Sequence, residues 1–212
     1  PTGRASCKAC RSNIPEGGIR ISMEVRSRFH DGNDIHHYCL GCGSRKCSLA
    51  SLEGLKTLRW GDQEAVARSF GMDPLEVLEP ATKGGLQQHW ADFDTLVATC
   101  KPKQIKEMVL HNAGNAVLQD YIKTLEYAHM AADGLRHGKL AACAQCGQRS
   151  LFYPGAGEVK CAGWYSPSVR CDFRCGAPER DGNKWELPAD LAKKKGVKEY
   201  LEGGSLATGN VV

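Results

Sequence analysis

Two sets of residues in this chain have the spacing of zinc ligands. In the first set, two cysteines separated by two residues are followed, 25 residues later, by a histidine and a cysteine: Cys7, Cys10, His36 and Cys39. In the second set, a similar pair precedes two further cysteines: Cys143, Cys146, Cys161 and Cys171. A two-residue gap brings both thiolates to one side of a tight turn, and four such ligands complete the closed tetrahedron of structural zinc. We therefore predict two zinc ions with structural roles, because neither set leaves a position open for chemistry.

The other cysteines and histidines leave some choices open. His37 adjoins His36 and is the second candidate at that position, and Cys175 is a substitute candidate in the other set. We interpret Cys42, Cys47 and Cys100 as free thiols rather than as a third metal site. The chain has eleven cysteines, and this odd number, together with the paired spacing, fits a disulfide framework poorly.

Composition excludes several classes of protein. No run approaches the roughly 20 apolar residues of a transmembrane helix, and the first residues lack the apolar core of a secretion signal. We therefore expect neither membrane association nor secretion. The formal charge of +4 is uneven, because residues 1–60 hold ten Lys and Arg against five Asp and Glu. A basic region of this kind suggests a polyanion as partner.

The elements around the first set are short strands and turns. Alternation of apolar and polar residues predicts a strand over residues 19–26, and a helix is expected from Asp62 to Phe70, with Asp62 as its cap. We assign residues 1–70 to this module. Prolines and glycines then predict a linker over residues 71–87.

The rest of the chain predicts helices followed by a ribbon. Apolar residues recur at helical spacing over residues 88–142, which we assign to a helical subdomain. Residues 143–190 are expected to form a zinc ribbon with a hairpin over residues 151–160, and residues 191–212 a disordered tail. The fold class is therefore α+β, built from small zinc-stabilised modules.

The first module resembles the PARP-type zinc finger, the break-sensing finger of poly(ADP-ribose) polymerases and some DNA ligases. The resemblance is carried by the run from Gly3 to Cys10, by Ile14-Pro15-Glu16-Gly17-Gly18, by the His36 and Cys39 pair, and by the segment from Leu52 to Gln63. The spacing of the family's ligands favours His36 over His37 as the zinc histidine. The chain departs from the pattern at Asp34, where the family has an aromatic residue.

The later module resembles the third zinc-binding domain of the same polymerases, the PADR type. This resemblance is carried by residues 103–109, by Ala132-Asp133-Gly134-Leu135, by the second cysteine set, and by Pro178-Glu179-Arg180 with Trp185. A departure occurs at Ser168, where the family has a tryptophan that passes the DNA signal to the catalytic region.

The resemblance implies three residues that contact nucleic acid. Arg4 and Arg20 match arginines that touch the phosphate backbone, a task that suits the planar fork of the guanidinium. Phe29 matches a phenylalanine that stacks on bases exposed at a DNA end. The alternative for Phe29 is that it fills the small core of the finger.

These observations favour a non-catalytic, zinc-dependent protein that binds DNA breaks or ends. The alternatives are the regulatory amino-terminal part of an NAD-using ADP-ribosyltransferase, and a structural subunit of a ribonucleoprotein or other large assembly. The sequence contains no phosphate-cradling glycine loop and no convincing nucleophile and base, so we expect no enzyme activity within it. The resemblance favours a nuclear location over a DNA- or ribosome-containing organelle, and RNA in place of DNA stays open.

Overall fold

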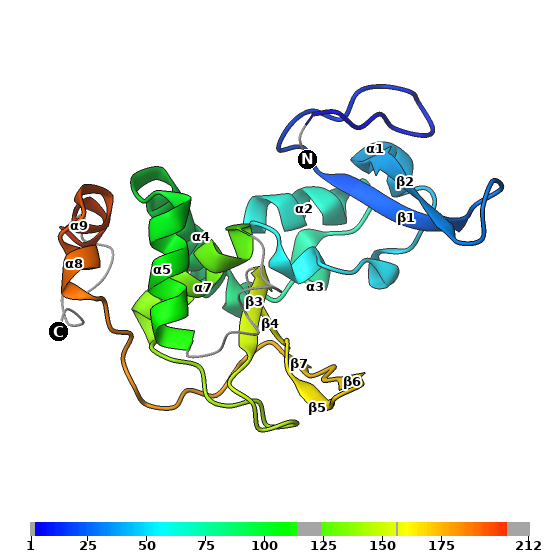
Figure 1. Cartoon of the computed structure of the whole chain (residues 1–212). Coiled ribbons are helices and arrows are strands. Elements are labelled where there is room, and N and C mark those ends of the chain that lie inside the picture. Colours follow the sequence, from blue (N-terminus) through cyan, green and yellow to red (C-terminus); the bar gives the residue numbers. More distant parts are fainter. Residues whose placement is uncertain (1–2, 114–123, 156, 203–212) are drawn as a thin grey trace. The chain divides into compact units, whose positions relative to one another are not determined.

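A computed structural model describes residues 3–113, 124–155 and 157–202 (Figure 1). The chain divides into two compact units, one ending at Ala81 and the other beginning at Thr82. Both combine helices with small sheets, as the α+β prediction requires. None of the helices in the described ranges is long and apolar enough to cross a membrane.

The first unit is a β-hairpin followed by short helices. Its elements are β1 (Arg20–Arg26), β2 (Asn33–Cys39), α1 (Leu40–Gly43), η1 (Leu49–Ser51), η2 (Leu55–Thr57), α2 (Trp60–Ser69), α3 (Pro74–Val77) and η3 (Pro80–Thr82), the last of which crosses the boundary. β1 and β2 pair in antiparallel register, with Ile21 opposite Tyr38 and both side chains buried. The predicted strand is confirmed, because alternate residues of β1 turn toward the interior.

The helix α2 begins two residues earlier than the sequence predicted. Its first residue, Trp60, is buried and donates a hydrogen bond from Nε1 to Glu64 Oε1 at 2.6 Å. The side-chain amide of Gln63 donates to the Leu58 carbonyl at 2.9 Å. These contacts fix the first turn, so Asp62 lies inside the helix rather than at its cap.

The second unit combines helices with a ribbon. Its elements are α4 (Lys83–Thr99), α5 (Pro102–Ala113), α7 (Thr124–His137), β3 (Leu151–Gly155), β4 (Glu158–Cys161), β5 (Trp164–Ser166), β6 (Val169–Arg170), β7 (Arg174–Cys175), α8 (Ala189–Ala192) and α9 (Lys195–Glu202). One sheet has the order β3-β4-β7, and β5 pairs with β6 separately. The predicted hairpin is confirmed, with Leu151 opposite Cys161 and Gly155 opposite Glu158.

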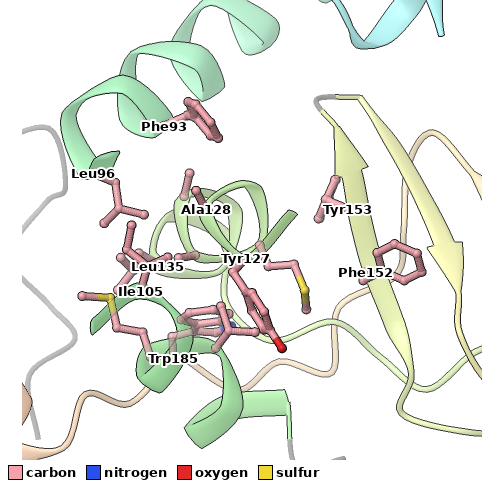
Figure 2. Close-up of a cluster of buried hydrophobic side chains, with 14 of the residues drawn as sticks. Phe93, Leu96, Ile105, Tyr127, Ala128, Leu135, Phe152, Tyr153 and Trp185 are labelled. Carbon is pink, nitrogen blue, oxygen red and sulfur yellow. The ribbon is translucent and has the colours of Figure 1, made fainter. Parts of the chain in front are cut away.

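The core of this unit surrounds α7. Nine consecutive residues of α7, from Tyr127 to Leu135, are buried, because α4, α5 and β3 all pack against this helix. Figure 2 shows Phe93 and Leu96 from α4, Ile105 from α5 and the indole of Trp185 around it. The helical and ribbon residues therefore share one hydrophobic core.

Some apolar positions in the predicted helical stripes are not core residues. Phe93, Leu96 and Ile105 are buried as expected, whereas Val97 is 45% exposed and Leu125 is 63% exposed. The predicted stripe residues Val117, Leu118, Tyr121 and Ile122 lie outside the described residues.

The predicted disordered tail contains a packed helix. In α9, Val197 and Tyr200 are buried, and the helix packs on α4. A β-carbon on Gly196 would overlap the Thr99 carbonyl oxygen, so α9 approaches the end of α4 as closely as a glycine allows. The expectation of disorder was wrong for residues 195–202, and residues 203–212 lie outside the described part. Residues 71–87, predicted as a linker, hold α3, η3 and the first turn of α4; the module boundaries themselves stay a prediction.

Candidate metal centres and nucleic-acid interface

Four thiols meet in the first unit. Their sulfur atoms all lie within 4.8 Å of one another, and they belong to Cys7, Cys10, Cys39 and Cys42. The sulfurs of Cys10 and Cys39 are 3.9 Å apart. A tetrahedral zinc with bonds of about 2.3 Å has sulfur–sulfur edges of roughly 3.8 Å, whereas a disulfide would need about 2.0 Å. The group therefore has the dimensions of a zinc site.

The backbone around Cys7 shapes the first half of this site. The amide of Arg11 donates to the Cys7 carbonyl at 2.9 Å, and the Cys7 amide donates to the Ser12 carbonyl at 2.8 Å. Arg11 takes a positive φ of 65°, which closes the turn. The Lys8 amide donates to the His37 carbonyl at 2.8 Å, and this bond holds the turn against β2.

The fourth member of the group is Cys42, and His36 is not in it. His36 and Cys39 are three residues apart in one strand, so their side chains leave opposite faces: His36 lies opposite Met23 and Cys39 opposite Arg20. Cys42 follows Cys39 by one turn of α1, which brings its sulfur back to the other three. The geometry thus differs from the sequence-based expectation. The signal for Cys42 in the sequence was a second two-residue gap, Cys39-Leu40-Gly41-Cys42. The prediction that Cys42 is a free thiol was therefore wrong.

The four thiols influence one another's ionisation. The backbone amide of Cys10 is the first of several hydrogen-bond donors that lower the pKa of Cys7 to about 6. The neighbouring thiol of Cys39, followed by burial, raises the pKa of Cys42 to about 12. Four thiolates side by side need a cation between them, and a divalent ion with sulfur affinity provides the charge.

The second group consists of the four predicted cysteines. The sulfurs of Cys143, Cys146, Cys161 and Cys171 lie within 4.8 Å of one another. Two edges measure 3.8 Å, between Cys143 and Cys171, and 3.6 Å, between Cys146 and Cys161. Burial opposes ionisation of Cys143, but hydrogen bonds from the Cys146 and Gln145 amides outweigh it, and the pKa of Cys143 is lowered.

The backbone at Gly163 packs against the sulfurs of the second group. The Gly163 amide donates to the Cys161 sulfur at 3.2 Å. A β-carbon on Gly163 would lie 3.1 Å from the Cys146 sulfur and 3.2 Å from the Cys161 sulfur. The backbone therefore lies directly against the sulfurs, as expected where a main-chain N–H supports a metal-bound thiolate. Both groups fit zinc in ligand type, number and spacing, so the chain has sites for two zinc ions.

The other cysteines lie outside these groups. The Cys47 thiol donates to the Gly43 carbonyl at 3.5 Å, and the buried Cys100 thiol donates to the Gly196 carbonyl at 3.5 Å. Cys175 lies on β7, where burial raises the pKa of its thiol. None of the three is in a described metal group.

Phe29 is almost fully exposed at the tip of the β1–β2 hairpin. Its exposed fraction is 94%, so it does not fill the finger core. The Ser27 hydroxyl accepts a hydrogen bond from the Phe29 amide at 3.2 Å, and the Ser27 amide donates to the Gly32 carbonyl at 2.9 Å. The loop is therefore held in a defined turn that presents the ring to solvent.

The two predicted phosphate contacts are also exposed. Arg4 precedes the first cysteine turn, and Arg20 begins β1. Burial, and then the positive charge of Arg20, lower the pKa of His37, whose Nδ1 lies 2.9 Å from the Ser22 hydroxyl. Arg20 thus lies on the same face of the sheet as Cys39 and His37, close to the first thiol group. Along β1, Arg20 is six residues from Arg26, or roughly 20 Å from the loop that carries Phe29.

Segments of the chain are similar to poly(ADP-ribose) polymerases. The polymerase of Sarcophaga peregrina is 37% identical over 72 residues, poly(ADP-ribose) polymerase 1 of Gallus gallus 32% over 111 residues, and that of Caenorhabditis elegans 37% over 76 residues. These matches cover 32%, 47% and 32% of this chain, but only 7%, 11% and 8% of the relatives. A comparison with models of known protein families gives no match. The resemblance inferred from the motifs is therefore confirmed over part of the chain, and the chain spans a small fraction of the curated relatives it matches.

Proposed function

We propose that this chain is a zinc-dependent DNA-binding protein that recognises DNA breaks or ends through its first unit. The observation that carries the proposal is the exposed ring of Phe29 on a hydrogen-bonded loop. A broken or nicked duplex exposes base faces that continuous DNA keeps stacked. An aromatic side chain can cover such a face, whatever the sequence.

The charge of the first unit supports this proposal. Arg4 and Arg20 are exposed, and the formal surplus of basic residues lies in this part of the chain. Arginines of this kind contribute affinity through phosphates and carry no sequence information. Phosphate contacts with end stacking would therefore select the structure of the DNA rather than its sequence.

We also propose that the two units have the PARP-type and PADR-type folds. Residues that carry the second resemblance meet in space, because Asp133 pairs with Arg180, and Gly134 packs against Trp185. Both metal groups are closed sets of four thiols, which suits structural zinc rather than catalysis. We expect the nucleus as the location because DNA is the proposed partner.

The experiment is a titration of the zinc-loaded chain with three labelled DNAs of equal length and sequence. One is nicked, one has blunt ends, and one is a closed dumbbell without ends or nicks. We expect the nicked and blunt DNAs to bind more tightly than the dumbbell. Equal affinity for all three would leave a general polyanion binder, and tighter binding to a single-stranded RNA of the same sequence would assign the surface to RNA.

The names of the relatives favour a second candidate function. All three are polymerases that are much longer than the matched segments. The chain would then be the DNA-sensing part of an NAD-using ADP-ribosyltransferase. Sequencing the native transcript tests this directly, and a reading frame without a transferase region would exclude it.

A further inference from the structure

A groove runs along the first strand of the first unit, and its lining includes neither the four thiols nor the Phe29 loop. It encloses about 720 Å³. One wall is the turn at Gly17 and Gly18 with the first residues of β1, and the other consists of residues 51–55 and Leu58. Asp62 and Val66 of α2 complete the lining.

The groove follows an unpaired strand edge. β1 lines it through Arg20, Ile21, Ser22 and Glu24, whose side chains alternate between the two faces of the sheet. A groove lined from both faces lies at the edge of the strand. Among the described residues, β1 pairs with β2 only, and its backbone forms no hydrogen bond to the opposite wall. Its outer N–H and C=O groups are therefore available to a further strand.

The charges of the groove favour a basic peptide as its occupant. Three carboxylates line it, those of Glu24, Glu53 and Asp62, against the single guanidinium of Arg20. Glu53 is exposed, and within the described parts of the chain neither Glu53 nor Asp62 forms an ion pair. An acidic groove repels phosphates and attracts lysine and arginine side chains.

The apolar residues of the lining indicate which sequence pattern a bound peptide would have. Ile19, Leu52, Leu55 and Leu58 line the groove together with the carboxylates. A strand turns successive side chains to opposite sides, so basic and apolar residues would alternate along an added strand. The β1 residues from Arg20 to Glu24 would pair with about five residues, or roughly 17 Å of extended chain.

We propose that this groove binds an extended basic segment of a partner protein, which joins β1 as a third strand. Main-chain hydrogen bonds to the β1 edge provide affinity, and the carboxylates with the leucines provide specificity. The first unit then has two interaction surfaces that share Arg20, an acidic peptide groove and the cationic DNA surface with Phe29.

The first test uses an immobilised library of random heptapeptides and the zinc-loaded full chain. We expect the library to select lysine or arginine at alternate positions, with apolar residues between them. The selected heptapeptide, added to isotope-labelled protein, should shift the amide signals of residues 20–24 and protect them from hydrogen exchange. Selection without this alternation, or shifts confined to other residues, would overturn the proposal.

A backbone-modified peptide tests strand addition itself. Two methylated peptides are compared, one with methyl groups on the odd-numbered backbone nitrogens and one with them on the even-numbered nitrogens. Each loses the hydrogen-bond donors along one edge of the peptide strand, so the peptide methylated on the edge that faces β1 should bind about tenfold or more weakly. The other peptide, which is methylated on the edge that faces solvent, serves as the matched control. Equal affinity of both forms and the unmodified peptide would rule out a third strand.

Two charge reversals test the acidic lining. Glu53→Lys should weaken the selected heptapeptide about fivefold or more, while Glu76→Lys, an exposed carboxylate on α3 outside the groove, should leave its affinity unchanged. Both variants should retain the zinc content and amide spectrum of the parent chain. Nicked DNA added to the peptide complex tells the two surfaces apart, because the DNA proposal involves Arg20 but not the rest of the groove. If the DNA displaces the peptide and shifts the amides of residues 21–24, the groove belongs to the DNA interface and the peptide proposal falls.

Discussion

Asp133 and Arg180 form a two-pronged ion pair within the second unit. Both terminal guanidinium nitrogens of Arg180, Nη1 and Nη2, donate to the Asp133 carboxylate, at 2.7 and 2.8 Å, across 47 residues of sequence. Arg180 also donates to the Gly138 carbonyl at 3.1 Å and to the Tyr153 hydroxyl at 3.2 Å. One side chain thus holds together the second half of α7, the residue after its end, the strand β3 and the segment that follows β7.

We expect Asp133→Asn to lower the free energy of unfolding of the second unit by about 3 kcal/mol. The variant leaves the Arg180 charge without its partner in a largely buried position, because the Asp133 side chain is only 7% exposed. We choose the lower end of the usual range since Arg180 is 27% exposed. Urea unfolding of the zinc-loaded chain measures the effect, with Lys198→Ala as control. Lys198 forms an exposed pair with Glu202, and its loss should cost less than about 1 kcal/mol.

Gly134→Ala should destabilise the second unit by about 3 kcal/mol, at the upper end of overpacking costs. A β-carbon at this position would overlap the indole of Trp185, and α7 is buried on all sides. The matched control is Gly85→Ala in α4, where a β-carbon meets nothing within 4 Å. There alanine should be neutral or stabilising by up to about 1 kcal/mol. Thermal unfolding of both variants measures the difference in stability. Similar melting temperatures would mean that the Trp185 side chain moves aside without cost.

Cys42→Ser should reduce the zinc content from two ions per chain toward one. In the structure Cys42 completes the first thiol group, and three thiols with a hydroxyl bind zinc more weakly. His36→Ala should retain two ions, because its side chain leaves the opposite face of β2 from Cys39. Metal analysis after dialysis measures both. The reverse pattern would restore His36 as the ligand and make Cys42 a free thiol.

Phe29→Ala should weaken binding to nicked and blunt DNA by about 1–3 kcal/mol and leave the closed dumbbell little affected. The melting temperature should barely change, because the ring is 94% exposed. Leu75→Ala, which removes another exposed apolar side chain (72% exposed) from the same unit, is the control. Parallel losses on all three DNAs would contradict end stacking.

Arg20→Ala should lower the salt dependence of DNA binding. Loss of one phosphate contact reduces the slope of log affinity against log salt by about 0.9 on duplex DNA. Arg68→Ala is a suitable control, because Arg68 lies on α2 and already pairs with Glu64 at 3.2 Å. Affinities measured at several salt concentrations give both slopes, and an unchanged slope for Arg20→Ala would remove this residue from the interface.

Local spacing in the sequence was sufficient for much of the site. The paired cysteines identified seven of the eight thiols in the two groups. Alternation identified β1, and the turn residues after Tyr153 identified the β3–β4 hairpin. These features depend on neighbours within a few residues, which a sequence displays directly.

Contacts between distant residues could not be read in the same way. The choice between His36 and Cys42 depends on which face of β2 meets the Cys7 turn. The bond that joins this turn to β2, from the Lys8 amide to the His37 carbonyl, links residues that lie far apart in the sequence. The helix α9 is short and lysine-rich, so it looks like a tail until Gly196 is seen against Thr99. Short helices obtain most of their stability from such tertiary packing.

The packing of α9 on α4 also determines when the second unit can finish folding during synthesis. The Cys100 thiol contacts the Gly196 carbonyl, and the two residues are separated by 96 positions. The ribosome must therefore complete nearly the whole unit before the end of α4 is covered, whereas the first unit has all its elements long before. Until then the apolar surface that later holds Val197 and Tyr200 stays open to water. Late closure of this kind leaves the α4 surface of the nascent chain exposed for longer than the core of the first unit.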